Sequence, residues 1–475
     1  MGQLFLGGTI FLFRFYFLLL FIGGGISAAR AQVFEGSTRG ASLGLEEPAL
    51  KESRQILDLH YESYTSAARP AYAGEFYRQN VLLNGRVKEA GTWGRHWNYR
   101  AQGDLSFSSG EEWFYPKMKD FYVEHGAVKV GLVSQSWDDF EEEWRLGLFR
   151  PRFLDNKLSE GQGGLVGIFF REGGFTLGLL PVNIPEFGPH YEEQNGDLVS
   201  KNPWFGKKPT QLRYNGTVAP IRYSVRMPPL KDLVLKPGAV AGYETRRFGI
   251  YRSRWSAAYK PMPQVLLNFP ADRKMILDDE GQYFSAEIAP VVAYHALFST
   301  DQKFQINERT HFRISALREV PVIEKRPSSW VTQELGPATY LSSRLDFELD
   351  PYSAKTFYLS QLKVWGGDRP DQGRYAGSET FFEKHQFYRE AYGMGFETKW
   401  FFKKPLFSSV GVIYDVAQEG GVFVTRHEVL LKKDLRLSAE VELLGLTSER
   451  NPLPDGFLST YRANDRAALG VSYVF

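Results

Sequence analysis

The sequence predicts an all-β fold: a single closed antiparallel transmembrane β-barrel of about 18–20 strands. The last ten residues predict a strand, because Phe475, Tyr473 and Val471 share one face while Ser472 and Gly470 lie on the other. A repeat of two residues is the repeat of a β-strand. Further upstream, tight turns and long polar loops alternate along the chain. The composition agrees, since 15% of the 475 residues are aromatic, and membrane barrels carry aromatic girdles at both interfaces.

The end of the chain also resembles a known family. A strand that finishes on an aromatic residue at the final position, with Tyr473 and Phe475 on one face, resembles the closing strand of Gram-negative outer-membrane β-barrels. In that family the terminal Phe is part of the signal that the barrel-assembly machinery reads. The resemblance therefore implies an assembly signal at Tyr473 and Phe475, a location in the cell outer membrane, and contact with outer-membrane lipid and lipopolysaccharide. The alternative is an ordinary soluble strand that ends the chain.

The first residues predict a targeting segment. Residues 5–22 are almost continuously apolar, and residues 29–31 form an A-x-A site. We expect a secretory signal peptide over residues 1–31, a periplasmic N-terminal extension without periodicity over 32–53, and the barrel over 54–475. The alternative is an anchor helix, because the apolar run is about long enough to span a membrane. The chain has no Cys, which excludes disulfides, thiolate metal sites and a lipidated Cys.

Turns and loops follow each other in the order that a barrel requires. Outer-membrane barrels have short periplasmic turns and longer extracellular loops. With Phe475 on the periplasmic side, every predicted tight turn falls on that side too. The tight turns are expected near residues 91–92, 126, 172–173, 217, 247, 298–301, 350–352, 403–405 and 432–434. The long loops are expected at 66–79, 110–116, 138–163, 183–208, 228–236, 261–281, 319–331, 367–388 and 448–464.

One stretch decides the strand count. Residues 219–227 form the weakest of the predicted strands. If they form a loop, a second strand is lost with them, and the count falls from about 20 to about 18.

Alternation assigns each side chain to one face of the wall. Trp255 and Tyr259 oppose Arg252 and Arg254. An Arg or Lys on the lipid face costs roughly 2–4 kcal/mol at the membrane midplane, so we expect the aromatic residues to face lipid and the charged residues to line the lumen. The same opposition recurs in residues 392–400, with Phe396 and Trp400 on one face and Glu397 and Lys399 on the other.

The predicted lumen is charged and mixed in sign. A water-filled channel with a transverse field would order and select solutes, and the slight excess of Arg suggests a mild anion preference. The alternative is a structural ladder of cross-strand ion pairs that stiffens the wall. The residues expected to line the lumen are Arg100, Asp104, Arg213, Arg252, Arg254, Glu287, Arg309, Arg313, Arg344, Asp346, Glu397, Arg436 and Glu440.

Two long loops are expected to narrow the mouth of the barrel. Segments 138–163 and 183–208 leave the same side of the wall and contain large apolar residues, which burial in the mouth would shield from water. The alternative is an outward loop that packs on its neighbours or on another protomer. The residues expected in this constriction are Arg150, Arg152, Phe187, Trp204 and Phe205.

An acidic cluster begins the first of these loops. Five carboxylates lie between Trp137 and Trp144. Clustered carboxylates can bind Ca²⁺ or bridge it to lipopolysaccharide phosphates, but this spacing does not match an EF-hand loop. The alternative is a solvated loop face.

The function that these observations favour is porin-like: passive diffusion of small hydrophilic solutes, without cofactor or catalysis. The histidines show no H-x-x-x-H spacing, and no G-x-S-x-G or phosphate-binding loop occurs. His311, expected on the inward face beside Arg309 and Arg313, is the one position to inspect for a barrel enzyme, and the alternative is a hydrogen-bonded lumen residue. The net charge of +2 argues against a nucleic-acid partner. The main alternative is a structural or surface-interaction barrel whose lumen is sealed or filled by lipid or a partner, and self-association into a homo-oligomer stays open.

Overall fold

A computed structural model gives the architecture. The predicted signal peptide and most of the predicted periplasmic extension lie outside the described residues. The structure describes residues 52–475 apart from 67, 69–75, 94–95, 153–155, 159–162, 187, 207–209, 215–216, 246–247, 271–274, 279–280, 323–329, 334, 351–354, 369–384, 402–403 and 448–455.

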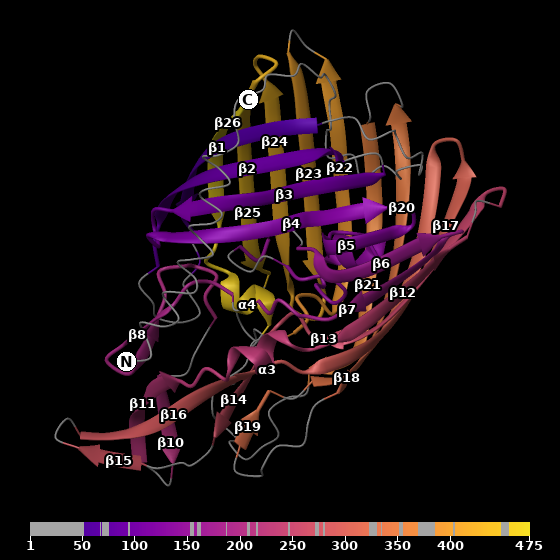
Figure 1. The fold of residues 1–475 in the computed structure, drawn as a ribbon. Coiled ribbons are helices and arrows are strands. Elements are labelled where there is room, and N and C mark those ends of the chain that lie inside the picture. Colours follow the sequence, from indigo (N-terminus) through magenta and orange to yellow (C-terminus); the bar gives the residue numbers. More distant parts are fainter. Residues whose placement is uncertain are drawn as a thin grey trace.

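The main sheet is a closed antiparallel barrel of 18 strands (Figure 1). Each strand pairs with the next barrel strand along the chain, and the last strand pairs with the first over Ile56–Tyr64 and Arg466–Val474, which closes the wall. The barrel strands are β1 (Glu52–Tyr64), β2 (Gln79–Trp93), β3 (Trp97–Ser108), β4 (Trp113–His125), β5 (Val128–Val133), β6 (Leu165–Glu172), β7 (Phe175–Leu180), β12 (Gly238–Glu244), β13 (Tyr251–Pro261), β17 (Tyr294–Asn307), β18 (Thr310–Val322), β20 (Leu335–Asp350), β21 (Lys355–Asp368), β22 (Glu390–Phe401), β23 (Pro405–Asp415), β24 (Gly420–Leu430), β25 (Leu435–Leu446) and β26 (Arg466–Val474).

The two rims of the barrel differ in the length of their connections. One rim carries the tight turns, the start of β1 and the end of β26, and we call it the turn rim. The other rim, the loop rim, carries the long connections, the longest of which joins β7 to β12. The predicted parity of turns and loops is therefore confirmed along most of the chain.

One predicted turn is wrong, and another lies outside the barrel. Residues 298–301 lie inside β17, where Ser299 and Asp301 point into the lumen and only resemble the polar residues of a turn. The turn falls at residues 308–309 instead. Near residue 217 the chain does reverse direction, since Tyr214 at the end of β10 (Gln211–Tyr214) pairs with Thr217 at the start of β11 (Thr217–Val225). This hairpin lies outside the barrel, because β7 pairs directly with β12. This pairing removes two predicted barrel strands, which leaves the lower predicted count of 18.

Outward and inward residues alternate along the barrel strands. On β13, Trp255 and Tyr259 are exposed on the outer wall, whereas Ser256, Ala258 and Lys260 are buried inside. The outer wall is broadly apolar, and its large exposed side chains include Leu59, Leu83, Leu177, Leu179, Phe298, Tyr392, Met394, Trp400, Leu469 and Val471.

A second sheet extends the loop rim. It has six strands, and β11 and β16 in it are parallel. Figure 1 shows it beyond the ends of β13 and β18, away from the C-terminus. We call it the side sheet, and it consists of β10 (Gln211–Tyr214), β11 (Thr217–Val225), β14 (Leu266–Pro270), β15 (Met275–Asp278), β16 (Gly281–Val291) and β19 (Trp330–Thr332). Its buried face packs Ile221, Tyr223, Phe284 and Ile288 against Leu198 of the small hairpin formed by β8 (Glu192–Gln194) and β9 (Asp197–Val199).

The core of the molecule lies inside the barrel. Large apolar side chains from the loops pack against inward residues of the wall such as Leu317, Tyr340 and Leu362. In the described part of the chain, the connections carry three short helices: α2 (Asp139–Trp144), α3 (Leu230–Val234) and α4 (Phe457–Tyr461). Within the described ranges, no helix is both long and apolar enough to cross a membrane.

Candidate functional site in the barrel lumen

The β5–β6 loop folds into the lumen and forms α2 there. Asp138 caps the helix, since its side chain accepts a hydrogen bond from the N–H of Phe140 at 2.9 Å. Arg145 ends the helix in the left-handed conformation, with φ at 54°. A helix of six residues is not stable by itself, so its contacts with the wall must hold it in place.

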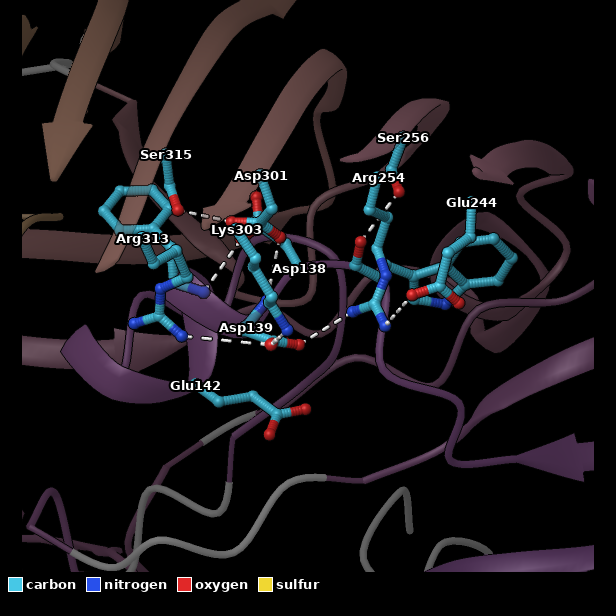
Figure 2. Close-up of polar contacts among 12 residues, drawn as sticks. Asp138, Asp139, Glu142, Glu244, Arg254, Ser256, Asp301, Lys303, Arg313 and Ser315 are labelled. Carbon is cyan, nitrogen blue, oxygen red and sulfur yellow. Dashed lines mark hydrogen bonds and ion pairs between the residues drawn. The ribbon is translucent and has the colours of Figure 1, made fainter. Parts of the chain in front are cut away.

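Acidic side chains of α2 dock on basic side chains of the wall. Asp139 accepts a hydrogen bond from Nη1 of Arg254 at 2.7 Å and also pairs with Lys303 (Figure 2). One turn later, Glu143 pairs with Arg313 and lies 3.4 Å from Nη1 of Arg344. We call these two carboxylates and four cations the α2 clamp. The four cations come from β13, β17, β18 and β20, so the clamp ties one loop to a whole sector of the wall.

The charges of the clamp are balanced locally. Glu244 accepts a hydrogen bond from Arg254 at 3.1 Å, and Asp346 lies 2.7 Å from Arg344. Asp301 accepts the backbone N–H of Asp139 at 3.2 Å. The cations of this sector are therefore neutralised by protein carboxylates rather than left free to attract anions.

The clamp keeps Asp139 ionised. Burial alone would raise the pKa of Asp139, but Lys303, Arg254 and Arg313 outweigh it and hold the pKa below its ordinary value. The neighbouring Asp138 behaves in the opposite way, because burial raises its pKa and the nearby Asp301 adds to the effect. One carboxylate thus carries the charge of the clamp, while the other serves as the helix cap.

A third carboxylate organises the rest of the loop. Glu141 is fully buried, and its Oε1 accepts the backbone N–H of Phe149 at 2.6 Å and that of Arg150 at 3.1 Å. Burial raises the pKa of Glu141 to about 6, against the effect of Arg150. Arg150 also donates to the carbonyl oxygen of Ser134 at 2.8 Å. The segment beyond α2 is therefore folded back onto the helix by its own hydrogen bonds.

Aromatic residues from several loops pack together in the same buried cluster as α2. Trp204 is fully buried, and its ring lies 5.3 Å from that of Tyr461 and parallel to that of Phe457. Phe457 stacks on Phe387 at 4.3 Å. We call this group, with Trp144 of α2, the mouth core. Lys157 of the β5–β6 loop adds a hydrogen bond of 2.5 Å to the hydroxyl of Tyr461.

The opposite side of the lumen is more open to water. The side chains of Arg86 and Arg100, on β2 and β3, are 40% and 39% exposed, whereas those of the α2 clamp range from 7% (Glu143) to 29% (Lys303). Arg86 pairs with Asp104 at 2.8 Å, and Arg100 lies 3.7 Å from Asp120. On β24 and β25, Glu428 and Arg436 pair at 3.2 Å and are also partly exposed. We call these exposed charged side chains of β2, β3, β24 and β25 the solvated wall.

A buried charge cluster lies where the barrel closes. Arg466, the first residue of β26, lies 2.7 Å from Glu62 on β1 and 2.7 Å from Glu442 on β25, and it also pairs with Glu440. Asn80 donates to Glu62 at 3.1 Å. These bonds cross both strand pairs of β26 and fix its position in the wall.

Some residues expected in the lumen lie elsewhere. Arg213 is on β10 and Glu287 is on β16, both in the side sheet, because the strands that carry them alternate like barrel strands but pair outside the barrel. Arg309 lies in the tight turn between β17 and β18 and is exposed at the turn rim. Phe187 is outside the described residues, and Phe205 packs against the core of the side sheet instead of the mouth core.

The remaining predicted residues divide between the two sides of the lumen. Arg252, Arg254, Arg313, Arg344 and Asp346 are in or beside the α2 clamp, with Arg252 at 2.6 Å from Glu244. Arg100, Asp104, Arg436 and Glu440 belong to the solvated wall, and Glu397 is half-buried on β22. Arg150 is buried in the β5–β6 loop, and Arg152 lies over the ring of Phe387 at 4.1 Å. Tyr473 and Phe475 are exposed at the turn rim, with ring centroids 4.8 Å apart.

Lys303 and Asp301 were not among the residues expected in the lumen. Both belong to a stretch interpreted as a turn and the strand after it, and the alternation through residues 298–303 was the signal that could have placed them inside. The acidic cluster is not a solvated loop face, because Asp138 and Glu141 are buried and Asp139 is clamped. Over the described part of the chain, no group of three or more His, Asp or Glu side chains is arranged to hold a metal ion.

Comparisons with known proteins reach only distant similarities. No family model matches the sequence, and no curated protein matches it. A solved mutant of Rh. blastica porin is similar with a TM-score of 0.36 and 9% identity, covering 90% of this chain and 100% of that chain. The Salmonella typhi OmpF complex with daunomycin is similar with a TM-score of 0.38 and 10% identity, covering 90% and 98%. The strand pairing by itself gives the fold: a closed antiparallel barrel with tight turns on one rim and inward-folded loops on the other.

Proposed function

We propose that the protein is an outer-membrane channel for the passive diffusion of small hydrophilic solutes. The path runs along the solvated wall, past the side of the β5–β6 loop that is not clamped. The observation that carries this proposal is the exposure of two charged side chains opposite the clamp: Arg86 on β2 and Arg100 on β3 are 40% and 39% exposed, against 7% (Glu143) to 29% (Lys303) within the clamp. Exposed charges inside a barrel need water around them, and a continuous column of that water is what a channel requires.

The mixed charge of the solvated wall supports a weakly selective path. Arg86, Arg100 and Arg436 alternate there with Asp104 and Glu428. Side chains of both charges orient a polar solute and exclude neither cations nor anions. Catalysis is not part of this proposal.

The barrel's partners follow from the same placement. The exposed apolar outer wall suits membrane lipid, and the exposed Tyr473 and Phe475 suit the assembly signal that the C-terminal strand resembles. We expect secretion through residues 1–31 and contact with lipopolysaccharide at the loop rim.

Planar-bilayer recordings of the purified protein test the path. We expect stepwise conductance, and Arg100→Glu should shift the zero-current potential towards cation selectivity. Lys433→Glu is the matched control, because Lys433 is exposed in the β24–β25 turn and the change in net charge is the same. Equal shifts in both variants, or none in either, would remove the solvated wall from the account.

A second candidate is a sealed barrel with a structural or surface-interaction role. It is favoured by the mouth core, where Trp144 of α2 is buried together with Trp204 and Phe457. In this case the correctly inserted protein gives no conductance steps, and the side sheet is the surface that binds a partner.

A further inference from the structure

The connection between the side sheet and the barrel is unusually apolar on its exposed surface. Leu230 and Leu235, at the two ends of α3, are 65% and 63% exposed. Ile184 of the same β7–β12 connection is exposed as well. It lies shortly after β7 in the chain, and β7 carries the exposed Leu177 and Leu179 on the outer wall. The apolar outer wall of β7 therefore continues past the ends of the strands and onto α3.

The segment is fixed in place by its other face. Leu233 is buried with Val265 and Val292, which lie near the two ends of the β13–β17 connection. The N–H of Asn183 donates to the carbonyl oxygen of Val234 at 2.8 Å. The exposed leucines thus belong to a docked element that presents them outward.

Aromatic and basic side chains border the same surface. Tyr259 and Tyr294 stack on the outer wall with ring centroids 5.3 Å apart, and the ammonium of Lys236 lies 5.9 Å from the ring of Tyr294. Lys231 is exposed on α3, with Asp232 beside it. Stacked tyrosines at a rim are typical of a membrane–water interface, and lysines next to exposed leucines are typical of segments that lie in that interface.

We propose that α3 and its flanks, residues 229–236, lie in the outer leaflet of the membrane, with Leu230 and Leu235 among acyl chains and Lys231 and Lys236 at headgroup phosphates. Continuity with the lipid-facing wall selects lipid as the occupant, and the cations match an anionic headgroup. The contact fixes the side sheet over one sector of the rim, above β7, β12, β13 and β17. This inference rests on the proposed outer-membrane placement of the barrel.

Spin labelling tests the position of the segment directly, because the chain has no Cys and single substitutions give unique labels. Nitroxides are placed by Leu235→Cys, by Leu177→Cys on the outer wall, and by Val218→Cys, an equally exposed apolar position on the side sheet. Their accessibility to oxygen, which enters lipid, is compared with that to a water-soluble nickel complex in proteoliposomes. We expect the ratio at 235 to be close to that at 177 and several-fold above that at 218.

The outcomes separate this inference from the function on which it rests. Lipid exposure at 177 with water exposure at 235 overturns the inference and leaves the membrane barrel intact. Water exposure at 177 means that the barrel itself is not inserted. A label at 235 shielded from both reagents means that protein covers α3, which also overturns the inference.

A second experiment tests whether Lys231 and Lys236 contact anionic headgroups. Vesicles of phosphatidylcholine with phosphatidylglycerol should raise the oxygen-to-nickel ratio at 235 above that in phosphatidylcholine alone. Lys231→Gln with Lys236→Gln should abolish this difference. A difference that persists in the double variant overturns the role of the two lysines.

Discussion

Nη1 of Arg254 on β13 donates a hydrogen bond to Oδ1 of Asp139 on α2 at 2.7 Å, across 115 positions of sequence. This bond joins the inward-folded loop to the barrel wall, and Lys303 and Arg313 reinforce it on neighbouring strands. The position of the loop, and with it the side of the lumen left to water, depends on these contacts.

Neutralising Asp139 should loosen the loop without unfolding the barrel. Asp139→Asn leaves three cations facing an amide, and removing one partner of a largely buried pair costs about 2–3 kcal/mol here. Hydrogen exchange of peptides from residues 134–150 should become markedly faster, while strand peptides stay protected. Glu428→Gln is the control, since its pair with Arg436 is well exposed, and it should leave loop exchange unchanged. Equal protection in Asp139→Asn would show that the mouth core alone holds the loop.

The loop should be more stable at pH 5 than at pH 7. Burial raises the pKa of Glu141 from 4.5 to about 6, so the folded loop binds this proton more tightly than the unfolded loop does. Its contribution is full below pH 4.5 and is lost as the pH rises through about 6, a change of about 2 kcal/mol. Asp138, whose pKa burial also raises, acts with the same sign, and Asp139 stays ionised in this window because its pKa is lowered.

The measurement is hydrogen exchange of the same peptides at both pH values, corrected for the intrinsic pH dependence of exchange. Glu141→Gln should flatten the profile, and Glu142→Gln, a neighbour whose carboxylate is partly exposed, should not. A loop that becomes less stable on acidification would contradict the assignment.

The sequence predicts which face of the barrel wall a strand residue occupies better than it predicts where the loops dock inside the barrel. A period of two places Arg254 inside and Trp255 outside, because the wrong face costs free energy in lipid. The same pattern appears in β11, and nothing local shows that this strand pairs with β16 in the side sheet rather than with a barrel neighbour. The pairing of Asp139 with Arg254 could not be predicted from a local pattern either. The site where a loop docks depends on which distant strands lie across the lumen from it.

Arg466 should stabilise the whole barrel through its closing strands. Arg466→Met leaves Glu62 and Glu442 buried without their cation, which costs about 3–5 kcal/mol. The urea midpoint of unfolding in lipid vesicles should fall accordingly. Arg436→Met, which loses an exposed pair on β25, should cost no more than about 1 kcal/mol. Similar losses in both variants would mean that the closing strands gain nothing from the buried cluster.

Trp204 should hold the mouth core together. Trp204→Ala removes a fully buried indole next to Phe457 and Tyr461, at a cost of about 3–5 kcal/mol. Loosened loops should raise the single-channel conductance while barrel assembly is unchanged, and deleting residues 186–206 should do the same. Phe205→Ala, which affects only the side sheet, is the control. Unchanged conductance in Trp204→Ala would remove the mouth core from gating.

A water-filled path should remain beside the clamped loop. Single-channel recording of the wild-type protein in a planar bilayer is the decisive test of this path. We expect discrete, ohmic steps that grow when Asp139→Asn or Trp204→Ala loosens the loops. Correctly folded, inserted protein that gives no steps, in the wild type and in both variants, would contradict it and leave the sealed barrel as the function.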